Sequence, residues 1–177
     1  MPKALNFAGL NQDLYDQKAD VIFLCFGLNE AFKGPSGLPQ FEKDLKAFIA
    51  NLRNNRYNGR RAPVLVLVSP IAHEQVGYLP ERGTAEHNVN LDRYTRAMRT
   101  IAGDYNRTAE PLYFIDLFTP SQARMQGGPR NGATENRAPS PITINGIHLN
   151  DAGYRLVADW MGQALGWNRL PDPDAEP

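Results

Sequence analysis

Three short apolar runs, separated by stretches of helical periodicity, constrain the fold of this chain most strongly. The runs are residues 20–26 (DVIFLCF), 64–68 (VLVLV) and 112–117 (LYFIDL). A strand that is apolar at nearly every position is buried on both faces, which is typical of a parallel sheet covered by helices. The runs therefore predict three parallel strands, with the intervening helices as crossovers between them.

Four helices are predicted around these strands, because apolar residues recur there at spacings of three and four. Their bounds are 8–18, 40–55, 90–107 and 151–165. The last helix is expected to turn five side chains inward: Tyr154, Val157, Trp160, Met161 and Ala164. Residues 69–88 and 118–141 are predicted loops, the second with one helical turn near Ser121. The order of elements predicts an α/β domain with a parallel sheet covered by helices.

The composition excludes some classes of partner. Acidic and basic residues number 19 each, so the formal net charge is zero and nothing favours nucleic acid or an anionic membrane surface. No apolar stretch approaches the length that spans a bilayer. The single cysteine, Cys25, lies in an apolar run and is expected to be a small core residue. The sequence does not indicate a cellular compartment.

Polar residues gather after the predicted strands. Gly27-Leu28-Asn29-Glu30 follows the first strand, residues 69–74 follow the second, and residues 145–148 precede the last helix. In open parallel sheets the ligand site lies outside the carboxyl ends of the strands. A histidine in such a turn is well placed to be a general base, because it titrates near neutral pH. His148 is therefore the first candidate for a functional residue.

Two of these segments resemble characteristic blocks of the SGNH, or GDSL-like, hydrolase family. The third block, Gly-x-Asn-Asp, is similar to ADVIFLCFGLNEAF, with Glu30 in place of the aspartate. The fifth block, Asp-x-x-His followed by a helix with Gly-Tyr, resembles GIHLNDAGY. Both occur in the family's order, and the resemblance covers about residues 5–166. It implies the flavodoxin-like three-layer fold and hydrolysis of carboxylic or carbohydrate acetyl esters by a serine nucleophile.

The resemblance also implies roles for individual residues. Asn29 would donate a hydrogen bond to the oxyanion, His148 would be the base, and Asn145 stands where the family has its aspartate. The alternatives are that Asn29 only caps a turn and that His148 only packs against the last helix. A small-molecule or glycan ester is the partner that this resemblance implies, and no cofactor is expected.

Three further residues are expected to line the substrate site: Gly27, Glu30 and His73. They follow the first and second predicted strands, at the edge of the sheet where a ligand would bind. A small metal site formed by His73 and Glu74 with Glu30 and His148 is an alternative. The spacing of these residues matches no metal-binding motif, so no metal ion is expected.

The family's first block, a Gly-Asp-Ser-type turn after the first strand, has no counterpart in this chain. None of the serines follows an N-terminal apolar strand; they are Ser36, Ser69, Ser121 and Ser140. We therefore expect residues 1–170 to be a partial domain without the first two strands and the nucleophile, followed by a disordered tail at 171–177. The strand at 20–26 would then be an uncovered edge through which two copies can associate.

Asn145 is the second departure from the family pattern. A carboxylate at this position would orient the histidine and stabilise the imidazolium that forms during catalysis, whereas an amide cannot supply the charge. Two hypotheses follow. The chain is a hydrolase-family domain that is inactive by itself, because it has no suitable serine. Alternatively, it is a non-catalytic binding or structural module that kept the fold.

Overall fold

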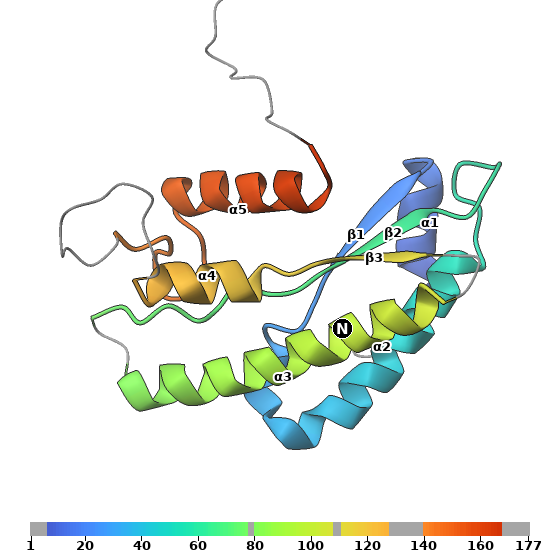
Figure 1. Cartoon of the computed structure of the whole chain (residues 1–177). Coiled ribbons are helices and arrows are strands. Elements are labelled where there is room, and N and C mark those ends of the chain that lie inside the picture. Colours follow the sequence, from blue (N-terminus) through green and yellow to red (C-terminus); the bar gives the residue numbers. More distant parts are fainter. Residues whose placement is uncertain (1–6, 78–79, 108–110, 128–139, 168–177) are drawn as a thin grey trace, which may run out of the picture.

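The sheet has the parallel order that the three apolar runs predict. The computed structural model describes residues 7–77, 80–107, 111–127 and 140–167. Three strands form one parallel sheet in the order β1 (Val21–Cys25), β2 (Val64–Val68) and β3 (Leu112–Ile115) (Figure 1). In its register Phe23 lies opposite Val66, and Val66 lies opposite Tyr113. Each apolar run contributes one strand, so the predicted parallel sheet is confirmed.

Helices cover both faces of the sheet (Figure 1). One face carries α1 (Ala8–Asp16), α2 (Leu38–Arg53) and α3 (Glu81–Tyr105), and the opposite face carries α5 (Asp151–Ala164). The short helix α4 (Phe118–Met125) follows β3 and contacts α3. The domain therefore has the three layers, α/β/α, that the sequence predicts.

The larger core lies between the sheet and the layer of α1, α2 and α3. Alternate strand residues point into it, because the side chains of a strand alternate between its two faces. Leu24, Leu65 and Leu67 are at most 2% exposed. The stripe of α2 that meets them contains Phe41, Leu45, Phe48, Ile49 and Leu52. This stripe has the three-four spacing that predicted the helix.

The second core lies between the sheet and α5. One stripe of the helix meets β2 and β3, and the residues in contact are Val66, Val68, Ile115, Val157, Trp160 and Met161. Three of the five inward-facing residues predicted for this helix are thus confirmed. Tyr154 is 65% exposed and Ala164 is also exposed, so their prediction was wrong. Only a narrow stripe of α5 reaches the sheet, and both residues lie outside it.

The strand β1 differs from the fully buried strand that its sequence predicts. Val21 is 50% exposed, Phe23 is 41% exposed, and Cys25 is exposed as well. Burial on both faces and a core position for Cys25 were therefore wrong predictions. The reason is that β1 is an outer strand of the sheet, whereas the α5 layer packs over β2 and β3.

Two helices depart from their predicted bounds. α3 begins at Glu81, well before residue 90, and its buried residues Thr84 and His87 belong to this extension. Residues 81–88 are mostly polar, so the three-four spacing of apolar residues that predicts a helix is missing there. α4 lies at the start of the segment predicted as a loop at 118–141, and because it includes Ser121 it confirms the helical turn expected there and extends it. The tail predicted at 171–177 lies outside the described residues. No helix in the described part of the chain is long and apolar enough to cross a membrane.

Candidate active site

The turn that carries His148 is closed by the side chain of Asn145. Its Oδ1 atom accepts hydrogen bonds from the backbone N–H groups of Ile147 at 3.4 Å and His148 at 3.0 Å. The same oxygen lies 3.0 Å from Nδ1 of His148. Below the turn, Thr143 and Leu149 form an antiparallel bridge. The two residues that the sequence paired as base and partner are therefore in direct contact.

These contacts determine which ring nitrogen of His148 carries the hydrogen. Two backbone donors meet the same atom of Asn145, so this atom is the oxygen of the amide rather than its nitrogen. An oxygen acceptor requires Nδ1 of His148 to be the donor. The neutral imidazole then keeps a lone pair at Nε2, the nitrogen that would act as the base. Asn145 therefore orients the histidine although it brings no charge.

Helix α5 fixes the far side of this turn. Asn150 is its N-cap: Oδ1 accepts from the N–H of Gly153 at 2.9 Å, and Nδ2 donates to the carbonyl of Pro141 at 2.9 Å. A Cβ on Gly153 would lie 2.0 Å from the carbonyl oxygen of Ile142. The start of α5 therefore approaches the segment before the turn so closely that only glycine fits.

The His148 side chain is exposed and lines an open hollow of about 570 Å³. Two apolar side chains border the same hollow, Ile144 with 68% exposure and Tyr154 with 65% exposure. An imidazole in this position is accessible to a small molecule, and apolar groups beside it suit the acyl part of an ester.

Asn29 lies in the other candidate turn, directly after β1. Gly27 opens this turn with a φ of +106°, and its N–H donates to Oε2 of Glu30 at 3.0 Å. A Cβ on Gly27 would meet Cδ of Pro70 at 3.3 Å and Sδ of Met98 at 3.4 Å. Asn29 is exposed, and its side chain makes no capping hydrogen bond with the following 3-10 helix η1 (Glu30–Lys33). Gly27 and Glu30 thus build a turn that presents the Asn29 amide outward.

A pair of histidines connects α3 to this turn. Nδ1 of His73 lies 3.0 Å from Nδ1 of His87, and Nε2 of His87 lies 3.3 Å from the carbonyl oxygen of Leu28. Phe32 stacks on the His87 ring with centroids 3.7 Å apart. Because a carbonyl only accepts, Nε2 of His87 is the donor, and His73 donates to Nδ1 of His87. The pair therefore holds Leu28, the residue next to Asn29.

Burial lowers the pKa of both histidines in this pair. For His87 the hydrogen bond to the Leu28 carbonyl opposes this effect, and the charge of a protonated His73 adds to it. A doubly protonated pair would also lose the contact between the two Nδ1 atoms, since both would be donors. The hydrogen-bonded arrangement therefore requires a neutral His87, whose Nδ1 accepts from His73.

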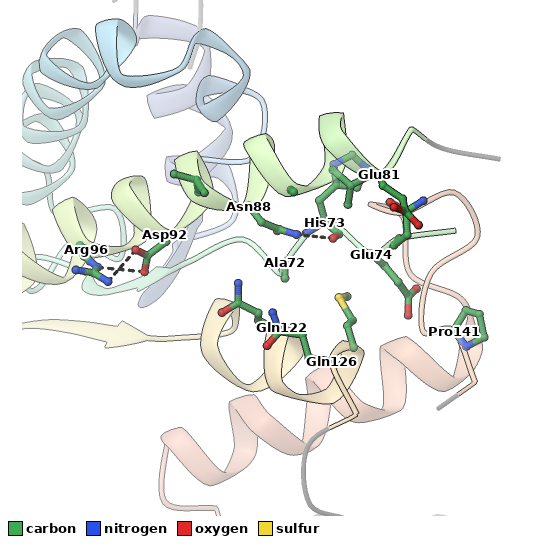
Figure 2. Close-up of a pocket in the computed structure, with 15 residues that line it drawn as sticks. Ala72, His73, Glu74, Glu81, Asn88, Asp92, Arg96, Gln122, Gln126 and Pro141 are labelled. Carbon is green, nitrogen blue, oxygen red and sulfur yellow. Dashed lines mark hydrogen bonds and ion pairs between the residues drawn. The ribbon is translucent and has the colours of Figure 1, made fainter. Parts of the chain in front are cut away.

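His73 also lines a cavity of about 760 Å³ between α3, α4 and the loop after β2 (Figure 2). Asn88 fixes its backbone, accepting from the His73 N–H at 2.7 Å and donating to its carbonyl at 2.8 Å. Farther along α3, Asp92 pairs with Arg96 at 2.8 Å. The position of His73 is compatible with a substrate-lining role, and contact with a substrate stays a prediction.

Glu74 points from the same loop toward the segment that leads into the His148 turn (Figure 2). Its carboxylate accepts hydrogen bonds from the backbone N–H groups of Ile142 and Thr143 and from the hydroxyl of Thr143. Among the described residues, no three His, Cys, Asp or Glu side chains form a group that could hold a metal ion. Glu74 therefore binds the backbone and the hydroxyl of the neighbouring segment.

The two buried serines are held in hydrogen bonds that join β2, β3 and α4. Oγ of Ser69 accepts from the N–H groups of Leu117 at 2.8 Å and Phe118 at 3.1 Å. Oγ of Ser121 accepts from the N–H of Ala72 at 2.8 Å and donates to the carbonyl of Leu117 at 2.7 Å. Both serines are at most 3% exposed, and the other two serines of the chain are exposed. The buried hydroxyls thus have structural roles.

The structure brings some of the predicted site residues together and leaves others apart. Asn145 contacts His148, and Gly27 contacts Glu30. The side chains of Asn29 and His148 come from separate turns, and within the described residues no hydrogen bond joins them. The assignment of these two residues to one active site therefore stays a prediction.

Sequence reasoning did not find the part that three residues play in shaping the two turns: Glu74, which it named only as a possible pocket or metal residue, Thr143 and His87. Glu74 and Thr143 are 69 positions apart in the sequence, so no local sequence pattern predicts their contact. His87 was expected in a loop and lies instead in the first half of α3. A signal for Glu74 was present nonetheless, because it is an acidic residue close to the buried strand β2, in the segment IAHEQV.

The fold and the two turns define a class of protein, a three-layer α/β domain with a histidine turn before its last helix. The model of the GDSL-like Lipase/Acylhydrolase family matches residues 4–156, and the chain belongs to this family. A comparison with curated proteins found no match to the chain.

Solved structures of two esterases and of an alpha/beta hydrolase enzyme have a similar fold. The acetyl xylan esterase AlAXEase is 25% identical, with a TM-score of 0.63; the match covers 90% of this chain and 73% of that one. A mutant of Axe2, an acetyl-xylooligosaccharide esterase from Geobacillus Stearmophilus, is 18% identical with a TM-score of 0.61, covering 92% and 68%. LAE5, an alpha/beta hydrolase enzyme from the metagenome of Lake Arreo, Spain, is 20% identical with a TM-score of 0.63, covering 92% and 67%.

Proposed function

We propose that this domain belongs to a hydrolase of small acyl esters, acetyl esters of carbohydrates among them, in which His148 is the general base. Membership of an acylhydrolase family supports ester hydrolysis as the reaction class. One observation carries the assignment of the base: Oδ1 of Asn145 lies 3.0 Å from Nδ1 of His148. This contact leaves Nε2 of the ring to accept a proton.

In the proposed reaction a serine hydroxyl attacks the carbonyl carbon of the ester while Nε2 of His148 takes the hydroxyl proton. The carbonyl oxygen becomes an oxyanion, and the side-chain amide of Asn29 donates a hydrogen bond to it. One such donor lowers the barrier by about 3–4 kcal/mol. His148 then protonates the leaving alkoxide, which departs as the alcohol. Water, deprotonated by the same histidine, attacks the acyl-enzyme, releases the acid and restores the serine.

The nucleophile of this reaction is assigned to none of the four serines. Ser69 and Ser121 are buried and hold backbone groups of β3 and α4. The two exposed serines do not follow a strand as the family's nucleophile does. We therefore propose that residues 1–177 supply the base and the oxyanion donor and are inactive by themselves.

The amide at position 145 sets the expected strength of the base. In a serine protease, exchanging the aspartate of the triad for asparagine lowers kcat about 10⁴-fold, because the histidine takes the wrong tautomer. Here Oδ1 of Asn145 faces Nδ1 of His148, so the ring has the useful tautomer. Asn145 brings no negative charge to stabilise the imidazolium, and the proposed activity is accordingly weak.

An acetylated carbohydrate is the substrate class that we propose. The likeness to an acetyl xylan esterase at 25% identity supports it. The hollow beside His148 is open and has apolar side chains at its border, which suits a short acyl group carried by a larger polar molecule. In this proposal Gly27, Glu30 and His73 lie along the substrate, on the side of the turn that presents Asn29.

A non-catalytic binding module is the second candidate function. It is favoured by the two positions at which this chain has lost an aspartate of the family pattern, Glu30 and Asn145. Glu30 uses Oε2 to bind the N–H of Gly27 within its own turn. A domain with these replacements would keep the fold and the hollow while binding an ester or a glycan without cleaving it.

Hydrolysis of p-nitrophenyl acetate and of acetylated xylooligosaccharides tests the proposal. We expect turnover by the longest natural form of the protein, loss of turnover after treatment with a fluorophosphonate, and no turnover by residues 1–177 alone. Fluorophosphonate-sensitive turnover by residues 1–177 would place the nucleophile within them. Binding of the oligosaccharides without turnover by the longest form would contradict hydrolysis and support the binding module.

A further inference from the structure

We infer that Glu74 is a positioning residue that holds the His148 turn in place. Glu74 belongs to the loop after β2, whereas the turn precedes α5, so their contact joins segments 68 and 69 residues apart in the chain. The inference gives Glu74 a role in the site proposed above and in that respect rests on the proposed function. The contacts themselves do not depend on that function.

The carboxylate of Glu74 accepts hydrogen bonds from three donors at the beginning of the turn. The N–H of Ile142 lies 3.0 and 3.1 Å from its two oxygens, and the N–H and hydroxyl of Thr143 lie 2.8 and 2.5 Å from Oε2. Glu74 is 7% exposed, and Ile142 and Thr143 are at most 4% exposed. A group that only accepts matches three donors, and hydrogen bonds to a carboxylate are stronger than those between neutral groups.

The backbone of Glu74 reaches the tip of the turn as well. Its N–H donates to the carbonyl of Gly146 at 2.8 Å. The N–H of Gly146 in turn donates to Oγ1 of Thr143 at 3.0 Å. Glu74 therefore contacts both the entry of the turn and the residue directly after Asn145.

These anchors matter because the tip of the turn has little packing of its own. The side chains of Asn145 and His148 are exposed, whereas the segment bound by Glu74 is buried. Without the carboxylate, three buried donors would lack their acceptor, and such groups recover hydrogen bonds by moving toward water. That movement would carry Gly146 with it and disturb the contact between Asn145 and His148.

Substitutions at both ends of the contact test this inference. Glu74→Gln keeps the size of the side chain and places an NH₂ group against backbone donors. Glu81→Gln is the matched control, because Glu81 is an exposed carboxylate at the border of the same cavity (Figure 2). Thr143→Val removes one donor to Glu74, and Thr143→Ser restores it.

Amide hydrogen exchange and long-range ¹⁵N spectra of the histidine rings supply the readout in the chain of 177 residues. In Glu74→Gln we expect exchange at the amides of Ile144 and His148 to accelerate roughly tenfold or more, the size of effect that losing hydrogen bonds to a charged group produces. The His148 ring should lose its Nδ1–H signature. Amides of β2 should keep their exchange rates, and Glu81→Gln should match the parent chain.

Unchanged exchange and an unchanged His148 tautomer in Glu74→Gln would overturn the inference. Equal acceleration in the turn and in β2 would also overturn it, because it would show a general loss of stability. If Glu74→Gln does not fold, the pair Thr143→Val and Thr143→Ser decides by the same spectra, with the serine variant expected to retain the parent signals. The esterase assay is separate, so its failure would refute the proposed function and leave the positioning result standing.

Discussion

At the scale of single residues, the amide of Asn145 orients His148 as a carboxylate would, but it does not supply a negative charge. Asn145 receives two backbone N–H groups and the ring N–H of His148 on one oxygen. Orientation and charge are thus separated at this position, because the geometry of the family pattern is present and its negative charge is not. The two contributions can be measured independently.

Asn145→Asp is expected to raise kcat on p-nitrophenyl acetate by roughly tenfold to a hundredfold in the form of the protein that turns over, because a carboxylate stabilises the His148 imidazolium. The gain should stay below the 10⁴-fold effect seen in serine proteases, since the tautomer is already correct. Gln163→Glu adds the same charge at the exposed far end of α5 and should leave kcat unchanged. A lower kcat in Asn145→Asp would contradict the role given to Asn145.

The residues that sequence reasoning recovered are those whose partners are close in the chain. Asn145 and His148 are three positions apart, and the resemblance to the family's Asp-x-x-His block was enough to pair them. The contacts of Glu74 and His87 were not predicted, because they depend on folding. Glu74 meets its partners only after β2 and the turn before α5 have been brought together. A periodicity or a motif cannot report such a contact.

At the scale of elements, the beginning of α5 decides how closely the His148 turn approaches the helix. Gly153 lies against the carbonyl of Ile142, and Asn150 caps the helix while binding the carbonyl of Pro141. The histidine turn and the first turn of α5 therefore form one packed unit. The glycine that the family pattern places in this helix has a steric reason in this chain.

Gly153→Ala is expected to destabilise the domain by about 1–3 kcal/mol, because its Cβ would lie 2.0 Å from a backbone oxygen. Gly162→Ala in the same helix is the matched control, since its Cβ would have no atom closer than 3.8 Å. That exchange should stabilise by about 0.4–1 kcal/mol through the unfolded chain. Urea unfolding measures both, and equal stabilisation by the two substitutions would contradict the close approach at Gly153.

The strands and most of the helices were predictable because their signals are local. β2 is apolar at every position and has the same bounds as its predicted strand. The start of α3 was not predictable from periodicity, because its first turns bury Thr84 and His87, which are polar. The exposure of β1 was likewise not predictable, because the same apolar run fits a strand that helices cover and a strand that they leave uncovered.

At the scale of the whole molecule, the outer strand β1 is the most exposed apolar part of the sheet. Val21, Phe23 and Cys25 lie on the face that α5 leaves open. Among the described residues β1 pairs with β2 alone. A second copy of the chain presents the same edge, and pairing the two edges would satisfy backbone groups and cover these side chains.

We therefore expect residues 1–177 to self-associate through β1, with a sedimentation coefficient that rises with protein concentration. Phe23→Lys should weaken this association by tenfold or more in Kd, because a charge on the edge opposes pairing; each tenfold corresponds to about 1.4 kcal/mol. Tyr113→Lys is the control, since Tyr113 is 51% exposed on the other outer strand. A monomer at every concentration, or equal effects of both substitutions, would contradict association through β1.

The most direct test of His148 as the base is the rate of p-nitrophenyl acetate hydrolysis by the longest natural form of the protein carrying His148→Ala. Removing a general base is expected to lower kcat by roughly 10²–10⁴-fold. Arg155→Ala, an exposed change one turn into α5, should retain the parent rate. A His148→Ala variant with the same kcat as the parent protein would contradict the assignment of His148 as the base of an ester hydrolase.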